Sequence, residues 1–275
     1  MRAVLTGMGF IGTHLYKRLS DDGVQVYHIP HDKLHDKVYL KDLFSELQDV
    51  DIIVHMASYG NLAYQIDVEE TVKANIVALV NLLEATRAVN YRSFINFSSS
   101  STLLPTDTMY SVTKRAGEDI CKVYAKKYNK PIISVLPYTV IGLGEPREHL
   151  IPQLIESCLF GKKIPFVSRP VHDFIGVNDF IEAIKLLIEK YYRKDEVEIG
   201  TGKQLSNEQI LKMVEKATGK SANIERTASL RSYDTGKWVA NPVIIKSIGW
   251  KQKQTIQQVI DEMVKTYENK KRTNT

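Results

Sequence analysis

Short runs of β-branched and apolar residues alternate along this chain with longer segments in which apolar residues recur every three or four positions. The runs that predict strands cover residues 3–6, 24–29, 51–57, 93–98 and 132–136. The clearest periodic segments, which predict helices, cover residues 11–19, 72–89 and 110–128. Strands separated by helices need crossover connections, which produce a parallel sheet covered by helices on both faces. The sequence therefore predicts a doubly wound α/β fold.

Beyond Gly142 the alternation becomes less regular. The pattern there predicts helices over 150–159 and 177–191, helices that begin near residues 207 and 256, and strands near residues 164, 173 and 196. We expect one domain over residues 1–145, to which strand and helix returns from about 173–200 also contribute. Residues 146–275 are expected to form a smaller C-terminal α/β lobe. No linker of biased composition separates the two parts, so this boundary is soft.

Composition excludes several classes of protein. A chain of 275 residues with 43% hydrophobic residues can bury a full core without disulfides, and its two cysteines lie in helical segments. The first residues lack the features of a signal peptide, and no apolar run reaches a membrane-spanning length. We therefore expect a cytoplasmic protein with no membrane partner. The net charge of +5 includes a basic C-terminal tail. The chain has no basic stripe with interleaved aromatic residues, so we expect no nucleic-acid partner.

The first predicted strand is followed at once by a glycine pattern. Gly7, Gly9 and Gly12 form G-x-G-x-x-G between that strand and the first helix. At such a turn the first glycine permits a tight bend, the second lets the backbone approach a pyrophosphate, and the third lets the helix pack closely. The alternative is an ordinary strand-to-helix turn with coincidental glycines. We expect a dinucleotide-binding turn that consists of Gly7, Met8, Gly9, Phe10, Ile11 and Gly12.

The end of the second predicted strand bears on which dinucleotide is bound. Asp32 lies 20 residues beyond Gly12 and is placed to accept hydrogen bonds from the ribose hydroxyls of NAD. His31 and Lys33 could equally favour the additional phosphate of NADP, so both cofactors remain alternatives and NAD is the expected one. The histidines and acids of this stretch also resemble a metal-ligand cluster. Because a strand end and a solvated loop would scatter these side chains, we expect no metal.

Tyr-x-x-x-Lys occurs three times in the chain, at Tyr110–Lys114, Tyr233–Lys237 and Tyr267–Lys271. Residues four apart lie on one side of a helix, so each spacing permits a functional pair. Only Tyr110 opens a predicted helix after a strand that ends in a run of serines, residues 98–101. The surroundings therefore favour the first pair as the catalytic one, although a tyrosine and a lysine on an exposed helix are usually just solvated.

Several stretches in this order resemble the extended short-chain dehydrogenase/reductase family, and in particular its nucleotide-sugar epimerases and reductases. They are the glycine turn, "DIIVHMAS", "NIVALVNLLEA", "FINFSSSSTL" and "YSVTK" in the first half, and "VLPYTVIGLGE", "LIPQLIESCLFGKKIPF", "HDFIGVNDFIEAI", "EIGTG" and "SIGW" in the second. The resemblance covers nearly the whole chain. It implies a Rossmann dinucleotide-binding domain at residues 1–145 and a substrate-binding lobe at residues 146–275.

The resemblance also implies a catalytic set of Ser100, Tyr110 and Lys114. Tyr110 would act as the acid and base, and Ser100 would hydrogen-bond the substrate hydroxyl or carbonyl. A free phenol has a pKa near 10, and the adjacent Lys114 ammonium is expected to lower the pKa of Tyr110 by favouring the phenolate. Proton transfer by the tyrosine would accompany hydride transfer between a sugar carbon and the cofactor.

Further residues receive roles by position in the same family. Around the cofactor the resemblance implies Met56, Ala57, Ser58, Ser98, Pro137 and Tyr138, in addition to the glycine turn, Asp32, Tyr110 and Lys114. Asn75 matches a buried asparagine that we expect to be structural. Around the substrate the resemblance implies Tyr59, Thr139, Arg169, His172 and Arg231, with Arg147 as another candidate for a phosphate ligand.

The chain departs from the family pattern at several places. Ser58 stands where a second alanine is usual, Thr139 where an asparagine is frequent, and His172 where an arginine usually binds the sugar-nucleotide phosphates. The glycine turn is one residue shorter than the common form. The loop between Ser100 and Tyr110 and the linker between the second and third strands are also short.

We expect an NAD(P)-dependent nucleotide-sugar 4-epimerase. The strand end "SSSST" resembles that of epimerases more than the Thr-Asp-Glu pattern of dehydratases. The alternatives are an NADPH-dependent reductase of a keto-sugar or small carbonyl, and a non-catalytic dinucleotide sensor. The resemblance also implies a homodimer joined through the helices at 72–89 and 110–128.

Overall fold

The computed structural model describes residues 1–275 apart from 48, 193–194, 229–233 and 274–275. Its contacts divide the chain into two compact units. The first consists of Met1–Pro137 with Ala183–Glu198, and the second of Tyr138–Glu182 with Ile199–Thr275. The first unit therefore also contains part of a helix and most of a strand that come later in the sequence. The separate functions expected for residues 1–145 and 146–275 stay predictions.

The first unit is built on a parallel six-stranded sheet with the order β2-β1-β3-β4-β5-β9. The strands are β1 Arg2–Thr6, β2 Gln25–Ile29, β3 Ile52–His55, β4 Ser93–Phe97, β5 Ile132–Pro137 and β9 Glu196–Ile199. Val4 of β1 lies between Tyr27 of β2 and Ile53 of β3, so the chain moves outward from β1 in both directions. This reversal of strand order is the point at which open α/β sheets bind their ligands. The predicted doubly wound α/β fold is confirmed.

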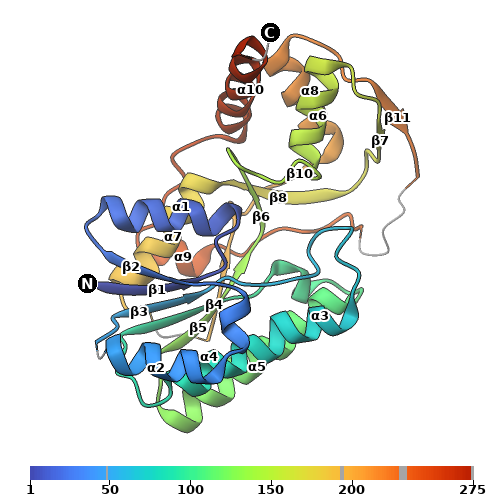
Figure 1. Ribbon diagram of the computed structural model, residues 1–275. Helices are drawn as coiled ribbons and strands as arrows, with labels where there is room; N and C mark the ends of the chain where they lie inside the picture. The colour runs from blue at the N-terminus through green and yellow to red at the C-terminus, as the bar shows by residue number, and fades with distance from the viewer. Residues whose placement is uncertain (48, 193–194, 229–233, 274–275) are drawn as a thin grey trace. The chain divides into compact units, whose positions relative to one another are not determined.

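Helices cover both faces of this sheet. The helix α1 and the second half of α7 lie on one face, and α2, α4 and α5 lie on the other (Figure 1). Their bounds are α1 Phe10–Asp21, α2 Lys37–Leu47, α4 Ala78–Thr86, α5 Met109–Tyr128 and α7 Val177–Glu189. The helix α5 begins with a capping box, in which Thr108 and Ser111 satisfy each other's backbone N–H groups, and it ends at Asn129 in the left-handed conformation.

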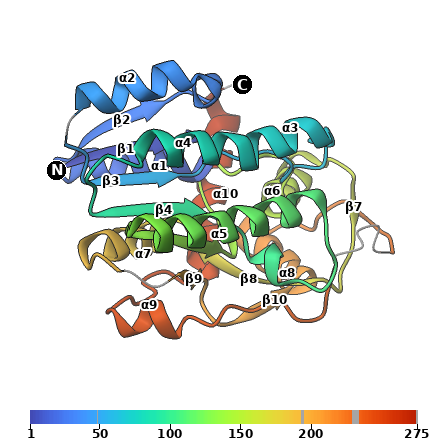
Figure 2. The same cartoon turned by 90° about the horizontal axis from the view of Figure 1, so that it is seen from below.

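The helix predicted over residues 72–89 is interrupted. The chain forms α3 at Val68–Val72, a π-helical turn at Lys73–Val77, and then α4, which runs beside α5 (Figure 2). A π turn is rare and is often found at functional sites. One-turn 3-10 helices occur at Asp32–His35 and Ser100–Leu103. The helix α2 was not predicted, because the stretch after β2 was taken for a shortened linker.

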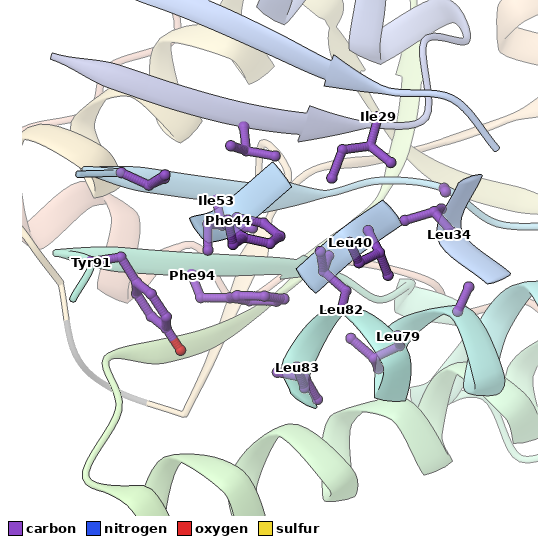
Figure 3. Close-up of a cluster of buried hydrophobic side chains, with 14 of the residues drawn as sticks. Ile29, Leu34, Leu40, Phe44, Ile53, Leu79, Leu82, Leu83, Tyr91 and Phe94 are labelled. Carbon is purple, nitrogen blue, oxygen red and sulfur yellow. The ribbon is translucent and has the colours of Figure 1, made fainter. Parts of the chain in front are cut away.

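A large apolar cluster fills the space between the sheet and the helices α2 and α4 (Figure 3). Buried side chains at helical spacing, Leu40 and Phe44 in α2 and Leu79 and Leu82 in α4, are packed with strand residues such as Phe94. This burial fixes which face of each helix is turned toward the sheet, whose strands β1, β3 and β4 end at the same edge because they are parallel.

The second unit has its own core. The strand β8 (Val171–Gly176) pairs parallel with β6 (Thr139–Ile141) and antiparallel with β10 (Gln204–Ser206), and β7 (Ile164–Phe166) pairs with β11 (Ile224–Arg226). Its helices are α6 Leu150–Phe160, α8 Asn207–Thr218, α9 Val243–Ser247 and α10 Ile256–Thr273. Apolar faces of α6, α8 and α10 form a cluster that includes Ile155, Leu211 and Ile260.

The buried carboxylate of Asp173 organises the centre of the second unit. It accepts hydrogen bonds from the N–H and hydroxyl of Thr201 and from the backbone N–H groups of Gly202 and Ala240, at 2.7 to 3.1 Å. Four donors satisfy a carboxylate that would otherwise be costly to bury. Among the helices that the structure describes, none combines the length and the apolar character needed to cross a bilayer.

Candidate active site

The glycine turn joins β1 to α1 with very little space around it. Gly7 has a φ of +79°, and a Cβ atom there would lie 2.5 Å from the backbone N of Ala57. A Cβ on Gly12 would lie 2.0 Å from the carbonyl oxygen of Gly7, so the helix packs directly on the turn. A Cβ on Gly9, in contrast, would meet nothing within 4 Å. Gly9 is the N-cap of α1, so open space lies in front of backbone N–H groups that favour an anion.

The ends of β1 and β3 are joined by a buried hydrogen bond between Thr6 and His55. The Thr6 hydroxyl lies 2.8 Å from Nδ1 of His55 and also accepts from the N–H groups of Met56 and Ala57. Burial, together with the nearby positive charge of Lys114, lowers the pKa of His55 to about 3. His55 is therefore neutral and acts as a fixed support for the Met56–Ala57 backbone against the glycine turn.

The loop after β3 is held by the π turn. The side-chain amide of Asn75 accepts from the N–H of Tyr59 and donates to its carbonyl, both at 2.9 Å, and it also donates to the Thr113 hydroxyl of α5 at 3.0 Å. The predicted structural role of Asn75 thus has a specific form. One side chain connects the loop that contains Ser58 and Tyr59 to the helix that begins at Tyr110.

The serines at the end of β4 point in different directions. The Ser98 hydroxyl donates to the carboxyl group of Glu118 in α5. Ser99 is the N-cap of the 3-10 turn, and its hydroxyl accepts from the N–H of Ser101. Ser100 is buried, with 2% of its surface exposed. Ser99 and Ser58 both influence the pKa of Tyr110, so the structure brings the predicted tyrosine near the serine run.

The pKa of Tyr110 differs from our expectation. Burial raises the pKa of this phenol, and the hydrogen bonds from Ser99 and Ser58 oppose that rise. The predicted lowering by Lys114 is therefore wrong for the structure described, because loss of solvent around the phenol outweighs the other influences. Burial also lowers the pKa of Lys114 to about 8, opposed by the charges of Cys121 and Glu118. Lys114 stays protonated at neutral pH.

One face of α5 carries an unusual set of buried polar groups. Lys114 and Glu118, one helical turn apart, are 5% and 4% exposed. Burial raises the pKa of Glu118, while its hydrogen bonds with Ser98 and Thr102 lower it. Glu118 thus contacts residues on both sides of Ser99 and Ser100, and it fixes the serine run against the helix that carries Tyr110.

The short loop between Ser100 and Tyr110 is braced from the outside by Arg115. Its guanidinium donates to the carbonyl of Thr102 at 2.8 and 3.3 Å and to the carboxylate of Asp107 at 2.9 Å. With the capping box of Thr108 and Ser111, this clamp holds both ends of the loop. These contacts therefore define the shape of the loop, although it is short.

The predicted ribose acceptor, Asp32, is the first residue of the 3-10 turn after β2 and is exposed. Beside it, the rings of His31 and His35 pack edge to face with centroids 5.8 Å apart, and Lys33 lies 3.9 Å from Asp36. Among the residues that the structure describes, no three His, Cys, Asp or Glu side chains form a group that could hold a metal ion.

The residues predicted to contact substrate fall in different parts of the chain. Tyr59 belongs to the first unit, and Thr139, Arg169 and His172 belong to the second, as does Tyr138; Arg231 lies outside the described residues. The His172 ring packs on Trp238 with centroids 4.8 Å apart, a contact that no sequence pattern predicted. Pro137 ends β5 in the first unit, and the Tyr138 hydroxyl donates to the Val239 carbonyl. The binding roles of all these residues stay predictions.

Sequence reasoning missed Ser99, Glu118 and Arg115. Ser99 could have been identified only from the direction in which each serine side chain points. That direction depends on the residue at which β4 ends. Glu118 did carry a signal, because it follows Lys114 by four residues and Tyr110 by eight and so continues the same helix face. Arg115 has no signal of its own, since its partners lie in a loop whose path the sequence does not determine.

The first unit, with its glycine turn at the reversal of strand order and a Tyr–Lys pair beside it, defines an enzyme of the dinucleotide-dependent Rossmann class. Residues 3–200 match the model of the NAD dependent epimerase/dehydratase family, and the chain belongs to this family. The resemblance predicted from the sequence is confirmed.

The chain is similar over most of its length to several known proteins. It is 25% identical to the "uncharacterized UDP-glucose epimerase YtcB" of Bacillus subtilis, over 86% of this chain and 89% of that protein. It is 24% identical to a probable UDP-glucuronate 4-epimerase of Rhizobium meliloti, over 98% and 97% of the two chains. The crystal structure of a Thermus thermophilus UDP-glucose 4-epimerase in complex with NAD superposes with a TM-score of 0.86, at 22% identity, over 98% of this chain and 99% of that one.

Neutral His55 predicts how stability depends on pH. Its folded-state pKa is about 3, whereas the ordinary value is 6.5, so the unfolded chain takes up the proton first as the pH falls. Below pH 6.5 this group should reduce the free energy of unfolding by about 1.4 kcal/mol per pH unit, or about 2 kcal/mol at pH 5.

Urea unfolding of the wild type and His55→Gln at pH 7 and pH 5 measures this effect. Because glutamine does not titrate, the stability advantage of the wild type should shrink by about 2 kcal/mol between the two pH values. An advantage that is the same at both pH values would show that His55 is not held neutral.

Proposed function

We propose that this protein is an NAD-dependent nucleotide-sugar 4-epimerase. The observation that carries the proposal is the position of Tyr110 in the first turn of α5, which follows the serine run at the end of β4, one helical turn from the buried Lys114. The names of the relatives support a nucleotide sugar as the substrate and position 4 as the carbon that is inverted. The chain would bind its substrate through Tyr59, Thr139, Arg169, His172 and Arg231.

The glycine turn fits a dinucleotide. The two positions where a Cβ would collide with backbone, Gly7 and Gly12, keep the turn and the helix close, and the open position, Gly9, leaves room for a pyrophosphate. Asp32 would accept the ribose hydroxyls, and Met56 and Ala57 would flank the cofactor. When bound, NAD supplies the reversible redox chemistry at the sugar carbon. We favour NAD over NADP because several similar solved structures, among them the Thermus thermophilus UDP-glucose 4-epimerase, contain NAD.

Tyr110 would move the proton of the sugar hydroxyl. Epimerisation leaves the composition of the substrate unchanged, so the proton taken from the carbinol oxygen must return to that oxygen within the same catalytic cycle. One group must therefore act first as base and then as acid. Lys114 would keep a buried positive charge one helical turn from Tyr110, and Ser100 would hydrogen-bond the same substrate oxygen as it changes between hydroxyl and carbonyl.

The cofactor proposal predicts a difference between two glycine variants. Gly9→Ala should fold normally, because its Cβ meets no protein atom, but should bind NAD about tenfold or more weakly, because the methyl occupies the pyrophosphate space. Gly236→Ala, whose Cβ also meets nothing, should change neither property. The measurements are melting temperature, titration with NAD(H) and NADP(H), and chromatography of nucleotide released on denaturation.

Retained NAD in the wild type would support the epimerase. Protein that purifies without nucleotide and oxidises NADPH only when a keto-sugar is present would instead identify the reductase alternative. Binding of neither dinucleotide would contradict the whole proposal.

The catalytic assignment predicts that Tyr110→Phe lowers kcat for interconversion of UDP-sugars by about 10²- to 10⁴-fold while NAD stays bound. The loss reflects the missing acid and base. Tyr267→Phe is the matched control, since Tyr267 belongs to another Tyr-x-x-x-Lys pair, on α10, and should keep full activity. If Tyr110→Phe retained wild-type turnover, Tyr110 would not be the proton-transfer group.

We further propose a homodimer that is joined through the π turn, α4 and α5. Supporting this are exposed apolar side chains on these elements, which include Val77, Val112 and Val123 with exposed fractions of 43%, 42% and 60%. Exposed apolar residues that gather on adjacent helices are typical of a protein interface.

Val123→Glu should therefore convert a dimer to a monomer in sedimentation experiments at micromolar concentration, because a buried carboxylate would have no partner. Val38→Glu, a change of the same kind at a position 70% exposed on α2, should leave the dimer intact. Wild-type protein that sediments only as a monomer would refute the proposed dimer.

A further inference from the structure

The side chain of Arg115 contacts the chain at two points, one at each end of the short loop before α5. Its guanidinium donates to the Thr102 carbonyl through Nε and Nη2, at 3.3 and 2.8 Å, and to the Asp107 carboxylate at 2.9 Å. Thr102 belongs to the 3-10 turn Ser100–Leu103, and Asp107 directly precedes the N-cap of α5. One side chain of the helix that contains Tyr110 therefore holds both ends of the loop.

The 3-10 turn connects Thr102 rigidly to Ser100. Thr102 donates to the Ser99 carbonyl from its N–H at 3.1 Å and from its hydroxyl at 2.9 Å. The Ser99 hydroxyl accepts from the N–H of Ser101 at 3.1 Å. Ser100 lies within this hydrogen-bonded turn and is 2% exposed, and Thr102 is 6% exposed. Because a single 3-10 turn moves as one unit, a shift of Thr102 would also displace Ser100.

The two contacts of Arg115 differ in what they contribute. The contact with Asp107 is an exposed ion pair, in which 39% of the arginine side chain and 55% of the aspartate side chain are exposed, and solvent weakens such pairs. The Thr102 carbonyl belongs to a buried residue, where the loss of a hydrogen-bond partner is costly. The carbonyl contact therefore anchors the turn, and the ion pair orients the guanidinium toward that carbonyl.

We propose that Arg115 is a positioning residue of this enzyme, which holds the turn containing Ser100 in a fixed place relative to Tyr110. The proposal rests on the proposed function in one respect, that Ser100 and Tyr110 act on the same substrate oxygen. Two groups that act on one atom must keep their geometry, and a displacement of about 1 Å can reduce turnover about a hundredfold. The turn and Tyr110 belong to different elements, so a contact between those elements is needed to fix their relative position, and Arg115 supplies it.

Hydrogen exchange followed by mass spectrometry tests this anchor without any measurement of activity. In Arg115→Ala, the backbone amides of residues 99–104 should exchange about tenfold faster than in the wild type, because the turn loses the contact that holds it to α5. Arg18→Ala is the matched control. Arg18 also forms an ion pair with an aspartate, Asp22, at 3.1 Å, and 38% of its side chain is exposed, so exchange at residues 99–104 should not change.

Kinetics then test whether the anchor serves catalysis. Arg115→Ala should lower kcat for interconversion of UDP-sugars about ten- to a hundredfold, while KM stays within about threefold and the content of bound NAD is unchanged. Millimolar guanidinium ion should restore part of kcat, because the missing side chain is partly exposed and leaves a space that solvent reaches. Urea at the same concentration carries no charge and should restore nothing.

A double variant tests whether Arg115 acts through Ser100. If it does, the addition of Arg115→Ala to Ser100→Ala should lower kcat by no more than about twofold, whereas independent effects would multiply. Multiplied losses would overturn the proposed route. Arg115→Lys gives a second test that keeps the charge and most of the side chain. It should also exchange faster at residues 99–104, since an ammonium cannot form the paired bonds of a guanidinium.

The outcomes separate this proposal from the proposed function. Unchanged hydrogen exchange in both Arg115 variants would overturn the proposal, even in a protein that epimerises UDP-sugars. Faster exchange with wild-type kcat would also overturn it, because the position of the turn would then not matter for turnover. Faster exchange together with a fully active Tyr110→Phe variant would confirm that Arg115 holds the turn and would contradict the proposed function. A melting temperature near that of the wild type excludes a general loss of structure.

Discussion

The buried polar face of α5 is the feature on which the rest of the candidate site depends. A lysine and a glutamate that are each about 5% exposed or less can remain in the interior only if neighbouring groups satisfy them. Glu118 accepts a hydrogen bond from Ser98, and this fixes the end of β4 against the helix. Since Tyr110 opens the same helix, the position of the phenol relative to the serine run follows from how these two charged groups are accommodated.

The same helix also determines the position of the loop after β3. Asn75 reaches both the Tyr59 backbone and Thr113 because the π turn shifts its side chain out of the ordinary helical register. Side chains that each take part in hydrogen bonds therefore connect the ends of β1, β3 and β4 with one another and with α5. Thr6 with His55 supplies the remaining connection between β1 and β3.

Elements with strong periodicity could be predicted from the sequence, whereas contacts within the site could not. The strands at 3–6 and 93–98 and the helix at 110–128 follow from alternating apolar runs and helical spacing, and the structure has them within a few residues. The helix α2 was missed although Leu40, Phe44 and Leu47 have helical spacing, because the stretch was taken for a shortened linker. The hydrogen bonds of Ser98 with Glu118 and of Asn75 with Tyr59 and Thr113 depend on loop paths and on side-chain directions that a local pattern does not contain. The raised pKa of Tyr110 likewise depends on burial, which only the tertiary structure determines.

The strand order has a consequence for the outer rim of the sheet. In the described sheet β2 pairs with β1 alone. It is therefore an edge strand, and the backbone groups on its outer side have no partner strand. Edge strands invite pairing with other chains, and proteins limit this with short length and polar side chains. At five residues, with exposed Gln25 and His28, β2 has both protections. At this edge, the sheet therefore relies on the composition of one short strand to prevent sheet-to-sheet aggregation.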